Sequence, residues 1–137
     1  MREKTVVYFG DFLPNYQWGG EIDKMLDRNH KTQHDSLSIS NVEFFEREFT
    51  DHSDVFPETG KIVLVVTDIL GEHMLLDSAI KNVRNVLEEK RRFAPDAFTV
   101  IQATGGQDKL TTAQIVIGDL HDEGRRSQLA DLIAAHL

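Results

Sequence analysis

The sequence contains no cysteine, which excludes disulfide bonds and thiolate chemistry. It also lacks long hydrophobic runs, because the longest, residues 62–66, has the length of a strand and not the roughly 20 residues of a membrane span. The first residues include neither the apolar region nor the small-residue cleavage site of a signal peptide. We therefore expect a cytoplasmic protein that does not insert into a membrane.

Basic side chains are in the minority. The chain has 15 Lys and Arg residues against 23 Asp and Glu residues, and its formal net charge is −8 at pH 7. A general nucleic-acid binder needs a basic surface to contact phosphates, so this function is not expected. An acidic surface suits a basic partner protein, although solubility alone also accounts for it.

Apolar and β-branched runs alternate with helical stripes along the 137 residues, with no repeat or linker between them. Because alternating strands and helices favour a mainly parallel sheet, we expect a single α/β domain over residues 1–137. Residues 40–43, Ser-Asn-Val-Glu, have the pattern of a capping box before the second helix. The expected strands are residues 5–9, 36–40, 61–67, 98–103 and 114–117, and the expected helices begin at residue 21, follow residue 42, surround residues 76–87 and close the chain.

The strand patterns predict a three-layer α/β/α sandwich whose five-stranded sheet has the order 2-1-3-4-5. The continuous apolar runs are typical of central strands, whereas the alternating run at residues 36–40 is typical of an edge strand. Only residues 104–113 separate the last two strands, so the fourth helix is expected to be short or missing.

Polar side chains follow the inner strands. In open parallel sheets, ligands bind outside the carboxyl ends of the strands, where the strand order reverses. Asp11 and Asp68 are therefore expected to line a crevice with Thr104, Gly105 and Gly106. Two carboxylates suit Mg²⁺, and one of them could instead accept a phosphoryl group. The alternative is that Asp, Gly and Thr are there only as ordinary turn residues.

A loop over residues 12–20 is expected to precede the first helix. Gly19 and Gly20 would then open that helix, where free backbone N–H groups could cradle an anion. Trp18 suits either a partner contact or a packed anchor of the loop. His30 and His34 have the spacing of two metal ligands, but their polar surroundings favour solvated histidines.

Three segments resemble the receiver domain of response regulators, which has a flavodoxin-like fold. Residues 62–70 (Ile-Val-Leu-Val-Val-Thr-Asp-Ile-Leu) are similar to the strand that ends in the phosphorylated aspartate. Residues 99–104 are similar to the strand that ends in the Thr or Ser switch residue, and residues 115–137 to the fifth strand and last helix. The resemblance implies that Asp68 is the phosphoryl acceptor, Asp11 a metal-binding acid and Thr104 the phosphate-sensing hydroxyl.

Two departures from the receiver pattern concern charge. Gly10 and Asp11 stand where receivers carry an acidic pair, and Gly118 and Asp119 stand where they carry a phosphate-contacting lysine. An anion in place of this cation would repel a phosphoaspartate. The resemblance is therefore to an atypical, degenerate receiver with reduced or lost phosphorylation and no catalytic residues.

Three functions remain open at this stage. The first is a non-enzymatic signalling domain that binds a protein through its first and last helices and the link between strands four and five; a homodimer is compatible with it. The second is a nucleotide or phosphate site in the crevice, with or without Mg²⁺, formed by Asp11, Asp68 and the pairs Gly19–Gly20 and Gly105–Gly106. The third is an acidic immunity or inhibitor protein that neutralises a basic partner.

Overall fold

A computed structural model of the chain describes residues 3–10, 13–67, 71–106 and 109–137. Its five strands pair in parallel in one sheet of order β2-β1-β3-β4-β5, as the sequence predicts. This strand order is that of flavodoxin-like folds. The strands are β1 (Lys4–Phe9), β2 (Asp35–Ile39), β3 (Lys61–Val66), β4 (Phe98–Ala103) and β5 (Ile115–Ile117).

The burial of each strand follows its place in the sheet. In β1 and β3 every residue after the first is buried, because helices cover both faces of these central strands. In the edge strand β2 only Ile39 is fully buried and Leu37 is partly covered. The alternating pattern of β2 therefore comes from a single covered face.

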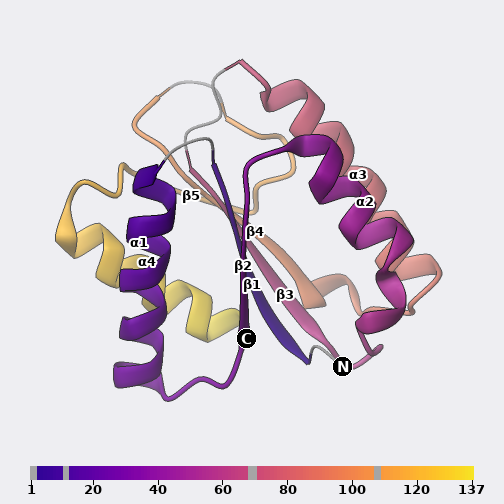
Figure 1. Cartoon of the computed structure of the whole chain (residues 1–137), viewed down its shortest axis with the longest axis horizontal. Coiled ribbons are helices and arrows are strands. Elements are labelled where there is room, and N and C mark those ends of the chain that lie inside the picture. Colours follow the sequence, from indigo (N-terminus) through magenta and orange to yellow (C-terminus); the bar gives the residue numbers. More distant parts are fainter. Residues whose placement is uncertain (1–2, 11–12, 68–70, 107–108) are drawn as a thin grey trace.

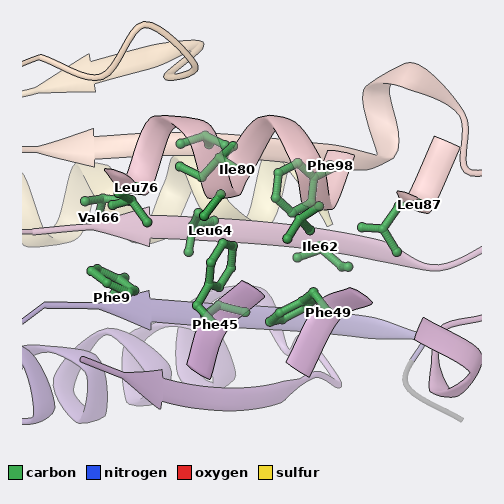
Figure 2. Packing of buried hydrophobic residues seen from close by; sticks show 14 of the residues in the cluster. Phe9, Phe45, Phe49, Ile62, Leu64, Val66, Leu76, Ile80, Leu87 and Phe98 are labelled. Atoms are coloured by element: carbon green, nitrogen blue, oxygen red, sulfur yellow. The ribbon is translucent and has the colours of Figure 1, made fainter. Parts of the chain in front are cut away.

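Helices cover both faces of the sheet and form the outer layers of an α/β/α sandwich (Figure 1). The helices α2 (Val42–Asp51) and α3 (His73–Glu89) cover one face, and α1 (Leu13–Met25) and α4 (Glu123–His136) the other. Figure 2 shows the first of the two cores, in which Phe45 and Phe49 of α2 and Leu76 and Ile80 of α3 meet side chains of the strands, among them Leu64.

The first helix differs from the sequence prediction. α1 begins at Leu13, eight residues before the predicted start, so Trp18, Gly19 and Gly20 lie inside a helix and not in a loop. The helix continues into a π-helical turn, η1 (Leu26–His30). The predicted anion cradle is therefore wrong, because the backbone N–H groups of Gly19 and Gly20 are not those of a helix start.

The start of α2 also differs by one residue. Asn41 caps this helix, and its side-chain oxygen accepts a 2.8 Å hydrogen bond from the N–H of Phe44. The predicted capping box, with Ser40 as the cap, is wrong by one residue. Asn41 is the cap, because it has the extended backbone and the side-chain oxygen that a cap needs.

The link between β4 and β5 contains no helix in its described residues, as predicted. Leu110 of this link is buried in the core that α2 and α3 cover, so one loop side chain fills space on that face. The Gln102 side chain of β4 accepts a 2.8 Å hydrogen bond from the N–H of Leu110 and so fixes the loop to the sheet. Asp77 of α3 holds the same loop through Thr111 and Thr112.

Candidate functional site

The described part of the predicted crevice lies at the carboxyl end of β4. Thr104 donates its N–H to the carbonyl of Ile117 at 3.1 Å, which continues the pairing of β4 with β5. Its hydroxyl accepts a 3.0 Å hydrogen bond from the N–H of Gly106 and so closes a short turn. Asp11 and Asp68 lie outside the described residues, so their approach to one another and to this turn stays a prediction.

Asp119 stands beside the glycine turn. A Cβ atom at Gly105 would lie 3.4 Å from its Oδ2 atom, so the ends of β4 and β5 meet there. The other carboxylate oxygen of Asp119, Oδ1, accepts a 2.8 Å hydrogen bond from the backbone N–H of His121 and is also hydrogen-bonded to Nδ1 of the His121 ring. These bonds, with the charge of Arg125, hold the pKa of Asp119 below its ordinary value.

A cation, Arg125, also lies at the end of β5, where the sequence pattern indicated only the acid Asp119. The guanidinium of Arg125, from the first turn of α4, lies against the backbone of Gly118 in space that any larger side chain would occupy. The ring of His121 also contacts Trp18 of α1, edge to face, with the ring centroids 4.8 Å apart. Sequence reasoning considered His121 only as a scattered histidine and missed Arg125, because the turn before α4 that brings them to Asp119 and Gly118 has no periodic pattern.

A second polar cluster lies at the opposite, amino-terminal edge of the sheet. The Tyr8 hydroxyl donates a 2.7 Å hydrogen bond to Oδ1 of Asp23, and the same oxygen is 3.0 Å from Nε2 of His34. The other ring nitrogen of His34 is 2.8 Å from the hydroxyl of Thr32. The cluster borders an open hollow of about 580 Å³ whose lining includes Lys4.

The prediction of two solvated histidines is wrong for His34. Its side chain is 7% exposed, because it packs between Asp23 and Thr32. His30 instead contacts Asp131 of α4 at 2.8 Å, so the two histidines do not share a site.

Asp23 stays ionised in this cluster. Burial by itself would raise its pKa, but hydrogen bonds from His34, Ser36 and Tyr8 outweigh burial and lower it. Burial and the neighbouring carboxylate raise the pKa of Tyr8. The Thr32 hydroxyl, the His34 imidazole and the Asp23 carboxylate are hydrogen-bonded in the order of a catalytic nucleophile, its base and the acid that orients the base. Thr32 and His34 are only two positions apart, however, so their hydrogen bond is a local one that stabilises the turn before β2.

A third feature is a groove between α2 and α3 on the outside of the molecule. It has a volume of about 570 Å³ and its apolar lining comes from Val42 and Leu75. We call this feature the α2–α3 groove. Its charged lining consists of Glu43, Glu46, Asp51, Glu72 and Arg47.

Large apolar side chains are exposed on α2 and α3, and one of them, Leu75, lines the α2–α3 groove. Met74 is 76% exposed, Leu75 63% and Phe44 50%; in residues 18–67, 71–106 and 109–137, the one other exposed large apolar side chain is Val116 of β5. Phe44 lines a smaller hollow of about 250 Å³ on the other flank of α2. The signal in the sequence is Met74-Leu75-Leu76, since three consecutive residues of a helix cannot all face a sheet.

No protein-family description matches this chain, and comparison with curated proteins finds no similar sequence. Within the described parts of the chain, no helix has the length and apolar character needed to cross a membrane. Among the same residues, no group of three or more His, Asp or Glu side chains is arranged to hold a metal ion.

Proposed function

We propose that this chain is a non-enzymatic regulatory domain that binds another protein through the layer formed by α2 and α3. The observation that carries the proposal is the exposure of Met74, Leu75 and Phe44 on this one layer. Exposed apolar side chains that lie on one layer of a fold are typical of binding surfaces. Covering a fully exposed side chain of this size contributes about 1.5–3 kcal/mol, so covering these partly exposed ones favours binding by a smaller amount each.

The sequence favoured a contact surface on α1, α4 and the β4–β5 link. Residues 18–25 of α1 and the described residues of α4 carry none of the large exposed apolar side chains, and the Arg126 side chain joins α4 to Glu21 of α1 at 2.9 Å. These observations support moving the proposed contact surface to the α2–α3 layer.

Reduced phosphorylation remains part of the proposal. At the end of β5, where the receiver resemblance calls for a free lysine, the chain has the ionised carboxylate of Asp119, bonded to His121. The guanidinium of Arg125 lies against Gly118 and interacts with the charge of the same carboxylate. The negative charge of Asp119 disfavours a phosphoaspartate nearby.

The test compares variants against a purified partner that is first identified by co-purification with the wild-type chain. Leu75→Gln and Met74→Gln are expected to raise the Kd at least tenfold in calorimetry, equivalent to about 1.4 kcal/mol each. Val116→Thr is the matched control, because it removes an exposed apolar side chain from β5 and keeps the β-branched shape. If Leu75→Gln and Met74→Gln bind as tightly as the wild type, the proposal is overturned.

A second candidate function is a phosphate-containing small molecule at the carboxyl edge of the sheet. It is favoured by the guanidinium of Arg125, which lies against Gly118 at the end of β5. Thermal shift assays with inorganic phosphate and nucleotides, with and without Mg²⁺, test it. A rise in Tm that is lost in Arg125→Gln and in Asp11→Ala supports the site, and an unchanged Tm argues against it.

A further inference from the structure

We infer that the partner of the α2–α3 groove is a basic amphipathic helix, whose apolar side chains enter the groove and whose Lys and Arg side chains contact its rim. This inference rests on the proposed function and names the chemistry of the partner. It is drawn from the charge, the lining and the length of the groove.

The charge of the groove is strongly one-sided. Among the residues that the structure describes, four carboxylates line it and Arg47 is the one cation in its lining. Glu43, Asp51 and Glu72 are exposed, while Glu46 accepts a 3.1 Å hydrogen bond from Asn82 of α3. A partner that covers this groove therefore needs basic side chains around its apolar contact, because an unpaired carboxylate at an interface is costly.

Exposed apolar residues lie on both flanks of α2. Leu75 borders the groove between the two helices, and Phe44 lies on the other flank of α2. Arg47 and Asp51 line both hollows, so the two are neighbours on α2. With 10 residues, α2 is about 15 Å long, which matches about three turns of a partner helix with anchors at positions i, i+4 and i+7.

A second copy of the chain fits this groove poorly. Two identical faces would bring Glu43, Asp51 and Glu72 of one copy against the same acids of the other. Like charges placed opposite each other at an interface cost several kcal/mol. The homodimer that the sequence left open is therefore not expected through this surface.

The test uses a synthetic helical peptide of about 14 residues, or four turns, with leucines at i, i+4 and i+7 and Lys or Arg elsewhere. Backbone amide shifts in ¹⁵N-labelled protein are expected to change along α2 and the first half of α3. The Kd is expected to rise at least tenfold between about 50 and 300 mM salt, because screening weakens the rim contacts. A peptide with Glu in place of the basic residues should not bind.

A pair of matched double variants separates local from overall charge. Glu43→Gln/Glu72→Gln removes two carboxylates from the groove, and Asp27→Asn/Asp96→Asn removes two exposed carboxylates elsewhere. Both change the net charge equally. Only the first is expected to raise the Kd, by at least fivefold; an equal effect of both would show that the peptide responds to net charge and would overturn the inference.

The other possible results of these experiments also test the inference. Amide chemical-shift changes outside α2 and α3, or binding of the acidic peptide as tight as that of the basic one, overturn the inference. A dimer in sedimentation that Leu75→Gln weakens makes a second copy the occupant and overturns it as well. If the natural partner needs Leu75 but ignores salt and the Glu43→Gln/Glu72→Gln variant, the basic helix is refuted while the proposed function stands. If the natural partner ignores Leu75 and Met74, the proposed function fails.

Discussion

The Asp77 carboxylate accepts a 2.6 Å hydrogen bond from the hydroxyl of Thr112, although the two residues belong to different parts of the fold. The same carboxylate accepts backbone hydrogen bonds from Thr111 at 2.9 Å and Thr112 at 3.0 Å. Asp77 is 9% exposed, so little water competes for these bonds. A buried acid of α3 thus holds the β4–β5 link in the place where a helix is missing.

The first prediction is that Asp77→Asn destabilises the protein by about 3 kcal/mol, because the amide NH₂ group turns one acceptor into a donor that faces a backbone N–H. Urea unfolding measures the change, and hydrogen exchange should show faster exchange at Thr111 and Thr112. Ser78→Ala, at the next and exposed position, is the control and should change the stability by less than about 0.5 kcal/mol. A loss equal to that of the control would contradict the role of Asp77.

The second prediction is a loss of stability in acid. Burial would raise the pKa of Asp77, but hydrogen bonds from Thr112 and Thr111 outweigh it and lower the pKa; the pKa of Asp23 is also lowered. Because these acids bind protons less readily in the folded state, their contribution is fully present above the unfolded pKa of about 3.9. It is lost as the pH falls through the lower folded pKa values.

Urea midpoints between pH 7 and pH 2.5 measure this dependence. The contribution of these two acids should keep the urea midpoint nearly constant down to about pH 4. Below that pH the midpoint should fall. Asp77→Asn, already destabilised at neutral pH, should show a shallower fall in acid than the wild type. Parallel curves for the two proteins would mean that Asp77 does not contribute to the acid sensitivity.

The third prediction separates two neighbouring glycines of α1. Gly20→Ala should stabilise the protein by about 0.5–1 kcal/mol, because alanine favours a helix and no atom lies within 4 Å of the added Cβ. At Gly19 the Cβ would lie 3.2 Å from the Tyr8 ring, which is buried and tied to Asp23 through its hydroxyl. Gly19→Ala should therefore be less stable than Gly20→Ala by at least about 1 kcal/mol; equal gains in Tm would contradict this packing.

The fourth prediction concerns phosphorylation. Incubation with acetyl phosphate and Mg²⁺ should give no stable phosphoryl adduct by mass spectrometry, because an ionised Asp119 follows β5 where the receiver pattern has a lysine. Asp68→Asn should give the same spectrum as the wild type. One phosphoryl group per chain that disappears in Asp68→Asn would refute the degenerate receiver and restore the chemistry that the resemblance implies.

The sheet could be predicted from the sequence because burial determines strand composition directly. A strand covered on both faces, such as β3, has to be apolar at every position, whereas β2 alternates. The start of α1 could not be predicted in this way. Gly19 and Gly20 lower its intrinsic helix propensity, and the contact of Trp18 with His121 depends on a distant segment of the chain. Pro14 in the first turn, where proline is favoured, was the available signal.

The candidate sites were less predictable than the sheet. A helical stripe indicates which side chains face the sheet, but it does not indicate whether Met74 or Leu75 is covered by some other element. The meeting of Arg125 with Gly118 also depends on the turn between β5 and α4, which no periodic pattern marks. The turn at Thr104 could be placed, because its position follows from the order of the strands.

Of the five strands of this sheet, the first to be translated is a central one. β1 pairs on one side with β2 and on the other with β3, where Lys4 lies opposite Lys61. During translation, the edge of β1 that pairs with β3 therefore stays open until residues 61–66 are made, well after β2. We expect this strand to be the segment of the nascent chain most in need of a chaperone, and soluble expression to depend on it more than on the edge strands.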